Sequence, residues 1–436
     1  MMGKARVRGA ALLAVAAVVL AGCGDSGSDG GGGGGGANAG ALEGRGPIKF
    51  ATGKDTSGNM QKLVDQWNSE HPDEKVTITE LPEAADEQRN QMVQNAQAQS
   101  KEFTILNLDV VWTAEFAANQ WVVQLPEDQF DLENFLEPAV NTAKYRDKLY
   151  AVPVYSDGGL LYYRKDLLQA AGVTEPPKTW AEMKDACAKV QATPAGKNVG
   201  CYAGQFDKYE GLTVNFSEAV QSAGGSILDE SGKPTVNTQE AKDGLNFLVE
   251  GVKSKEIPAA AVTYKEEEGR RAFQDGQLIF HRQWPYQYAL ANATDGSSKV
   301  AGKFDVAPLP GKDGPGVSTL GGHNFAISAF AENKATALDF IKFFTSEEAE
   351  RSNLIATSQA PTRANLYDDA ELVKQFPYLT TLKESILNAV PRPQAVKYNE
   401  VTAAMQEAAY GAMNGETSTD DALKELQSKL ESLTAQ

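Results

Sequence analysis

Strand and helix patterns alternate regularly after residue 47, and this alternation limits the possible folds more than any other feature of the chain. Apolar or alternating segments predict strands at residues 48–52, 75–81 and 103–108. Helical spacing of apolar residues predicts helices at residues 60–67 and 92–96, between these strands. A βαβαβ order of this kind favours a parallel sheet covered by helices. The predicted fold class is therefore α/β.

A second αβ region is predicted to begin near Tyr155. Its expected strands and helices lie at residues 160–163, 277–281 and 304–307, and at residues 180–190 and 241–252. Three later segments predict a strand returning to the first sheet, an apolar helix and a final helix, at residues 321–328, 335–344 and 422–433. Because 436 residues exceed what one ordinary core accommodates, we expect two substantial domains.

The N-terminus is typical of a bacterial lipoprotein precursor. A basic segment at residues 4–8 precedes an uninterrupted apolar run of twelve residues, 10–21, which is shorter than a membrane span of roughly 20 residues. The run ends in Leu-Ala-Gly-Cys, which resembles the lipobox of lipoproteins. We therefore expect residues 1–22 to be a cleaved signal peptide and Cys23 to be lipidated. An ordinary signal peptide followed by an incidental cysteine is the alternative.

Residues 23–46 are expected to form a tether behind this anchor. The tract is rich in glycine and serine, and residues 30–36 are all glycine. A flexible coil of this length reaches roughly 25 Å root-mean-square, which suits a domain that must move over a membrane surface. The expected location is extracytoplasmic, with the protein lipid-anchored to the cell membrane.

The charge balance restricts the partners of the chain. Lys and Arg number 41 against 58 Asp and Glu, a net charge of −17, which becomes −20 once the three basic residues of the signal peptide are removed. Such a surface repels nucleic acid and anionic headgroups, so we expect no nucleic-acid partner and a neutral or cationic ligand. The short run Glu266 to Glu268 predicts a solvated helix face.

The two remaining cysteines, Cys187 and Cys201, would face an oxidising compartment. A disulfide between them would close a short loop and stabilise the fold by about 3 kcal/mol. Two buried free thiols are the alternative.

The sequence lacks the motifs of several kinds of catalytic site. His71, His281 and His323 are the only histidines, and they stand far apart in no ligand motif, so we expect no metal site. Nucleophile-elbow, phosphate-loop and dinucleotide motifs are also absent, and no cofactor is expected. A glycan hydrolase remains an alternative, because such an enzyme needs only two suitably spaced carboxylates.

Candidate ligand-binding residues follow the predicted strands. Ligands of open α/β sheets bind beyond the carboxyl ends of strands, where the loops of the first sheet carry Asp55, Arg89 and Asp109. Aromatic residues stand beside turns at Tyr155 and in the sequence Trp-Pro-Tyr at residues 284–286. A sugar ring has an apolar face and a polar rim, so aromatic platforms with carboxylate or guanidinium neighbours suit it.

Three longer motifs resemble family 1 extracellular solute-binding proteins of ABC importers, at residues 151–167, 273–276 and 337–343. The resemblance spans nearly the whole mature chain. Within the family the chain is most similar to trehalose/maltose-binding lipoproteins, through Glu87-Gln88-Arg89, Asp109-Val-Val-Trp112, Tyr155, Trp284-Pro-Tyr286, Leu320-Gly321-Gly322 and Pro391-Arg392-Pro393.

The resemblance implies a disaccharide site lined by Arg89, Asp109, Tyr155, Trp284, Tyr286, Gly321, Gly322 and Arg392. In such a site Asp109, Arg89 and Arg392 would bond sugar hydroxyls. Trp284 and Tyr286 would stack on the sugar, and the glycine pair would let the backbone approach it. The chain departs from the pattern at His323, where these relatives have tryptophan, and at Asp55, which would replace a glutamate.

The fold implied by the resemblance is two-lobed and periplasmic-binding-protein-like, with hinge-linked αβ domains. We expect crossings near Val154, Asp305 and Gln359, an N-terminal lobe of residues 47–153 plus 306–358, and a C-terminal lobe of residues 154–305 plus 359–436. The implied partners are a small sugar, namely trehalose or a related α-linked disaccharide or oligosaccharide, and the membrane permease subunits of an importer. We expect a monomer with no enzymatic activity. A receptor for a noncarbohydrate polar solute is a further alternative.

Overall fold

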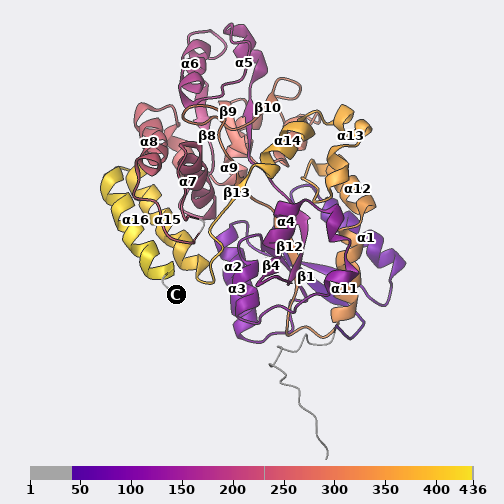
Figure 1. The fold of residues 1–436 in the computed structure, drawn as a ribbon. Helices are drawn as coiled ribbons and strands as arrows, with labels where there is room; N and C mark the ends of the chain where they lie inside the picture. The colour runs from indigo at the N-terminus through magenta and orange to yellow at the C-terminus, as the bar shows by residue number, and fades with distance from the viewer. Residues whose placement is uncertain (1–41, 230, 435–436) are drawn as a thin grey trace, which may run out of the picture. The chain divides into compact units, whose positions relative to one another are not determined.

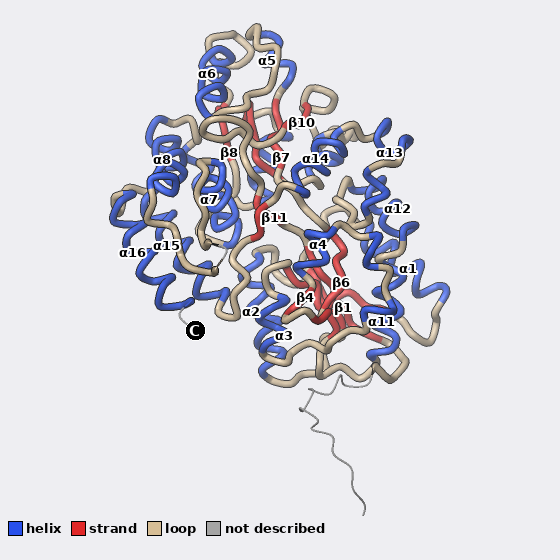
Figure 2. The backbone as a smooth tube through the Cα atoms, viewed as in Figure 1, coloured by secondary structure: helices blue, strands red, loops and turns tan. Residues whose placement is uncertain are grey.

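The computed structural model describes residues 42–229 and 231–434. The predicted signal peptide, Cys23 and most of the predicted tether lie outside the described residues. The described part of the chain contains two main β-sheets, each packed against helices, and two hydrophobic core clusters (Figures 1 and 2). The predicted α/β class is confirmed.

The first sheet has five strands in the order β2-β1-β3-β12-β6. Their bounds are β1 Ile48–Thr52, β2 Val76–Glu80, β3 Ile105–Asp109, β6 Ala151–Tyr155 and β12 His323–Ile327. As predicted, β1 pairs in parallel with β2 and β3. The sheet is mixed, because β12 returns antiparallel to both β3 and β6.

Tyr398, from a helix near the end of the chain, joins the core of the first sheet, to which six other helices contribute side chains. They are α1 Asn59–Glu70, α2 Ala85–Gln97, α3 Thr113–Ala118, α4 Glu137–Thr142, α11 Lys334–Phe344 and α12 Glu347–Thr357. Aromatic rings fill the space between sheet and helices: Phe50 lies edge-on to Phe325 at 4.7 Å, and Trp67 lies edge-on to Phe340 at 5.5 Å. The short elements η1 Glu127–Gln129, η2 Leu132–Asn134, β4 Lys144–Tyr145 and β5 Lys148–Leu149 connect α3 to α4 and α4 to β6.

The second sheet has four strands in the order β10-β7-β9-β8. Their bounds are β7 Leu160–Tyr163, β8 Gly200–Ala203, β9 Leu278–Gln283 and β10 Asp305–Ala307. β7 runs antiparallel to β9 and β10, whereas β8 runs parallel to β9. Cys187 and Cys201 form the predicted disulfide, with their Cα atoms 5.4 Å apart, and it ties a helix to strand β8.

The helices around the second sheet are more numerous. They are α5 Lys165–Ala170, α6 Trp180–Gln191, α7 Glu210–Ser222, α8 Gln239–Ser254, α9 Glu266–Gln274, α10 Gln287–Ala291, α13 Ala370–Gln375, α14 Tyr378–Leu387, α15 Tyr398–Met413 and α16 Thr419–Thr434, with short turns η3 Ala259–Thr263 and η4 Ala364–Tyr367. Helices α15 and α16, in yellow in Figure 1, pack beside α7 and α8 although they close the chain.

The chain passes between the two sheets at three places. The first passage follows β6 directly and leads to β7, and the third follows α12. The second passage lies later than the expected Asp305, because β10 still pairs with β7 of the second sheet. Before the chain reaches β12, strand β11 (Thr319–Leu320) pairs in parallel with β13 (Val390–Pro391) in a separate two-stranded sheet.

In the ranges 42–229 and 231–434, no helix is long and apolar enough to cross a membrane.

Candidate ligand-binding site

A cavity of about 430 Å³ lies where strand ends of both sheets and the passages between them meet. The loop after β1 and the ends of β3 and β6 line it from the first sheet. The start of α7, the start of α9 and the segment after β9 line it from the second. A volume of this size falls within the roughly 300–1,000 Å³ of small-molecule sites.

The cavity brings together nine of the ten predicted ligand-binding residues. The nine are Asp55, Asp109, Tyr155, Trp284, Tyr286, Gly321, Gly322, His323 and Arg392. They come from positions up to 337 residues apart in the chain, as Asp55 and Arg392 show. The expectation that these residues lie near one another agrees with their positions in the fold.

Arg89 differs from the other nine because it does not line the cavity. Its guanidinium forms a buried ion pair with Glu115 of α3, with Nε donating to Oε2 at 2.8 Å, and its Nη1 donates to Asn399 at 3.0 Å. The preceding residue, Gln88, lines the cavity instead. One step along an α-helix turns a side chain by about 100°, so neighbouring residues of α2 face different partners.

Arg392 links the two sides of the cavity through buried ion pairs. Its Nη2 donates to Asp109 at the end of β3 at 2.6 Å, and its Nη1 donates to Glu210 at the start of α7 at 2.5 Å. Arg392 is only 2% exposed, and its Nε has no hydrogen-bond partner among the described residues. A buried guanidinium with one free donor beside a cavity is suited to bond a polar ligand.

Glu210 is held on several sides. Besides Arg392, it accepts hydrogen bonds from the hydroxyls of Tyr398 and of Thr402, the latter at 2.7 Å. Burial raises the pKa of the Glu210 carboxyl to about 7, although Arg392 acts in the opposite direction. Burial therefore favours the protonated form of Glu210, and the ion pair with Arg392 favours the ionised form.

Asp55 accepts hydrogen bonds from the backbone of the segment that follows it. Its Oδ1 accepts from the backbone N–H of Ser57 at 2.8 Å, and its Oδ2 accepts from the N–H of Met60 at 2.9 Å. These bonds satisfy donors at the start of α1, as acidic side chains at helix starts commonly do. The side chain is thus fixed at the rim of the cavity by the loop that follows β1.

Three aromatic side chains line the cavity with distinct partners. Trp284 has the guanidinium carbon of Arg282 3.8 Å from its ring centroid. Tyr286 donates from its hydroxyl to Glu267 at 2.9 Å. Tyr155 and the ring of His323 meet nearly at right angles, with centroids 6.2 Å apart.

The glycine pair lets the backbone pass close to these rings. A Cβ atom on Gly321 would lie 2.8 Å from ring atoms of Trp284, and one on Gly322 would overlap the carbonyl oxygen of Tyr155. Gly322 also has φ +117°, a conformation that favours glycine. Both positions therefore require glycine for a structural reason at the cavity wall.

Five acidic residues that line the cavity were not predicted from the sequence: Glu83, Asp157, Glu210, Glu266 and Glu267. The predicted solvated face at residues 266–268 is wrong for Glu267, which is 7% exposed and is held by Arg270 and Tyr286. Asp157 follows β6 by two residues, so the strand-end rule that selected Asp109 would also have found it. Burial raises the pKa of Asp157 to about 7.

The charges around the cavity disfavour an anionic ligand. Seven carboxylate residues line it, Asp55, Glu83, Asp109, Asp157, Glu210, Glu266 and Glu267, against two basic residues, Lys54 and Arg392. Arg392 is neutralised by its own acidic partners. Among the described residues, no group of three or more His, Cys, Asp or Glu side chains is arranged to hold a metal ion. The arrangement suits a polar ligand that is neutral or cationic.

Comparison with known proteins gives consistent matches. The family model described as bacterial extracellular solute-binding protein matches residues 52–351. A probable ABC transporter-binding protein of Deinococcus radiodurans is 34% identical over 378 residues, covering 85% of this chain and 89% of the relative. A mannitol-binding protein of Pseudomonas aeruginosa is 27% identical, covering 78% of each chain.

Two solved structures illustrate the similarity of fold. Maltose-bound MalE3 of T. maritima superposes with a TM-score of 0.84 at 34% identity, covering 89% of this chain and 99% of that chain. The GacH receptor of Streptomyces glaucescens, solved unliganded and with acarbose, superposes with a TM-score of 0.80 at 24% identity, covering 90% and 99%. The predicted two-lobed fold is confirmed by this similarity.

Proposed function

The chain belongs to the bacterial extracellular solute-binding protein family, and on this basis we propose that it is the sugar receptor of an ABC importer. Members of this family bind solutes and catalyse no reaction, so the protein is an extracytoplasmic binding protein and not an enzyme. The alternative of a surface glycan hydrolase is therefore set aside.

One observation carries the sugar assignment: the aromatic platform of Trp284 stands in a cavity whose rim bears carboxylates and a guanidinium. An indole covers the apolar face of a sugar ring, while Asp109, Asp157 and Arg392 can bond hydroxyls at its edge. The excess of acidic over basic residues argues against a phosphodiester, the main noncarbohydrate alternative.

The proposed ligand is trehalose or a related α-linked disaccharide or short oligosaccharide. The similarity at 34% identity to a protein solved with bound maltose supports an α-linked disaccharide. The presence of His323 where the resembling proteins have tryptophan would leave one end of the cavity less apolar than theirs. Selection among α-linked sugars would then depend on polar contacts at that end.

We propose that ligand binding closes the two domains, each built around one of the sheets, over the ligand. The three passages of chain between them form the hinge, and the ligand shifts the equilibrium toward the closed form because it contacts both sides. The permease subunits would recognise that closed form. Lipidation of Cys23 and the tether of residues 23–46 would keep a monomeric receptor near the permease.

Calorimetric titration tests this proposal. The purified protein is titrated with trehalose, maltose and maltotriose, with a glycerophosphodiester as the anionic comparison, and the sugars are then checked for cleavage. We expect saturable binding of at least one intact sugar, lost in Trp284→Ala. Trp180→Ala is the matched control, because Trp180 stacks on Phe247 away from the cavity. Absence of heat with every sugar would contradict the proposal.

A further inference from the structure

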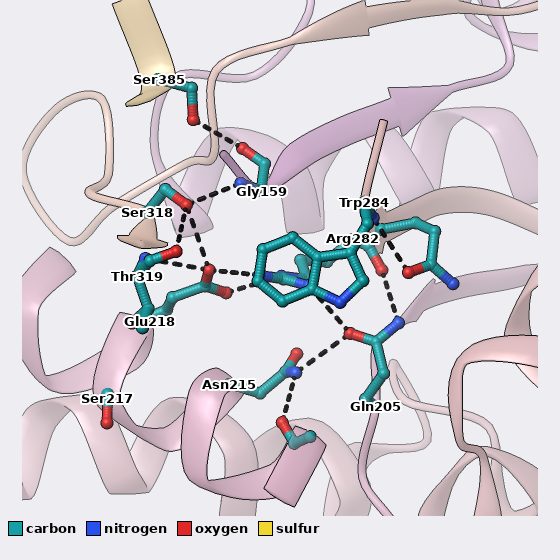
Figure 3. A network of polar contacts seen from close by, with 12 residues as sticks. Gly159, Gln205, Asn215, Ser217, Glu218, Arg282, Trp284, Ser318, Thr319 and Ser385 are labelled. Atoms are coloured by element: carbon teal, nitrogen blue, oxygen red, sulfur yellow. Dashed lines mark hydrogen bonds and ion pairs between the residues drawn. The ribbon is translucent and has the colours of Figure 1, made fainter. Parts of the chain in front are cut away.

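A fully buried ion pair lies directly behind the Trp284 platform (Figure 3). Arg282 is on β9, two residues before Trp284, and is 0% exposed. Its Nε donates to Oε2 of Glu218 at 2.7 Å, and its Nη2 donates to Oε1 at 2.5 Å. This is the bidentate geometry in which an arginine is most firmly oriented.

The oriented guanidinium lies over the ring of the Trp284 indole. Its central carbon is 3.8 Å from the centroid of the Trp284 ring. Trp284 lines the cavity whereas Arg282 does not, so the guanidinium covers a part of the indole that is turned toward the protein interior. A guanidinium in this position attracts the ring by cation–π interaction, which is strongest when both groups are desolvated.

A third partner completes the orientation of the guanidinium. Nη1 of Arg282 donates to Oε1 of Gln205 at 3.1 Å, and Gln205 in turn donates to the backbone carbonyl of Arg282 at 3.2 Å. Asn215 donates to the same Gln205 oxygen at 3.1 Å. The guanidinium is therefore oriented by two groups from outside β9, Glu218 and Gln205, and the indole contacts a guanidinium that is already fixed in place.

Glu218 also bonds the passages between the two sheets. Its Oε1 accepts from the N–H of Thr319 at 3.1 Å and from the hydroxyl of Ser318 at 3.4 Å. The Ser318 hydroxyl accepts from the N–H of Gly159 at 2.6 Å. A Cβ on Gly159 would lie 2.7 Å from Nη2 of Arg282, so the passage after β6 runs tightly against the pair.

Stability alone is a weak reason for such a pair. Removing two charges from water is costly, and a buried ion pair often stabilises a protein no better than apolar residues of the same size. The geometry here offers a more specific role, because the pair contacts the platform, the passage before Gly321 and the passage after β6.

We propose that Arg282 and Glu218 are positioning residues that hold the Trp284 indole in its ligand-binding orientation and join it to the hinge passages. This role rests on the proposed function, in which Trp284 is the platform for the sugar. Neither residue touches the ligand in this account, and both act through the indole.

The test compares two arginine-to-lysine variants. Arg282→Lys keeps the charge but removes the planar fork. Arg164→Lys is the matched control, because Arg164 is also buried and pairs bidentately with a carboxylate, Asp166, away from the cavity and from the passages between the sheets. We expect sugar affinity to fall about tenfold in Arg282→Lys, because an indole that is no longer held in one orientation must be ordered when the sugar binds, at a cost of about 1 kcal/mol. Affinity should stay within about twofold in Arg164→Lys.

A second readout does not depend on the sugar. Ligand-free protein labelled with 5-fluorotryptophan is examined by fluorine NMR, with the Trp284 signal assigned by its loss in Trp284→Phe. We expect Arg282→Lys to shift and broaden the Trp284 signal, and Arg164→Lys to leave it in place. If Arg282→Lys does not fold, Glu218→Gln, which keeps the size of the side chain and removes its charge, takes its place.

An unchanged Trp284 signal in a folded Arg282→Lys or Glu218→Gln protein would overturn the positioning role. An equal loss of affinity in both lysine variants would also overturn it, because the effect would then be general destabilisation. If the unmodified protein binds no sugar, the proposed function fails, and the fluorine signal still decides whether the pair orients the indole.

Discussion

Replacing Arg392 with methionine removes the charge that joins the two sides of the cavity. Methionine has a similar length, so the main loss is electrostatic. In the folded protein Asp109 and Glu210, which are 9% and 3% exposed, would then face each other without a cation. Removing one partner of a buried ion pair costs about 3–5 kcal/mol, and here two carboxylates lose the same partner.

Urea unfolding followed by circular dichroism measures this effect. At pH 8 we expect the free energy of unfolding of Arg392→Met to fall by about 3–5 kcal/mol. The loss should be smaller at pH 5.5, because burial already raises the pKa of Glu210 to about 7 and a protonated Glu210 carries no uncompensated charge. Adding Asp109→Asn and Glu210→Gln to Arg392→Met should recover at least half of the lost stability.

Two results would refute this reasoning. One is an Arg392→Met protein whose free energy of unfolding lies within about 1 kcal/mol of the unmodified protein, which would place the pair among weak surface bridges. The other is a triple variant as unstable as Arg392→Met alone, because the loss would then come from packing and not from charge.

Two further predictions concern the cavity wall and the fold beside it. Gly322→Ala should lower the free energy of unfolding by about 1–3 kcal/mol, because alanine at φ +117° is strained and its methyl group meets Tyr155. The control is Gly172→Ala, where φ is +71° and the space is open. It should lower the free energy of unfolding by less in the same urea assay. Burial raises the pKa of Glu350 from 4.5 to about 7, so the stability that this group contributes is fully present below pH 4.5 and is lost as the pH rises to about 7. Glu350→Gln should flatten this slope in thermal unfolding measured from pH 4.5 to 8, and an unchanged slope would contradict the assignment.

Regular elements could be predicted well because their patterns are local. The strand expected at residues 48–52 has the bounds of β1, and the strand expected at residues 160–163 has those of β7. The position of Asp109 followed from a general rule, that ligands bind beyond the carboxyl ends of strands. Such features depend on residues close together in the sequence or on the topology of the sheet.

Side-chain partners could not be predicted, because they are set by packing between distant segments. Arg89 was expected at the cavity, and only the packing of α2 against α3 shows that Gln88 takes that place. The local sequence predicts a solvated Glu267, and only the structure shows that it accepts a hydrogen bond from Tyr286, nineteen residues later. Arg282 and Glu218 are 64 residues apart, and nothing in the local pattern of either residue indicates the pair.

A crystal structure of the protein with a bound α-linked disaccharide would show whether Trp284 is the platform for the sugar. We expect one sugar ring against the indole of Trp284, with ring carbons within about 4 Å, and hydroxyls bonded to Asp109 or Arg392. Sugar bound elsewhere on the protein, or in the cavity without contact to Trp284, would contradict this expectation.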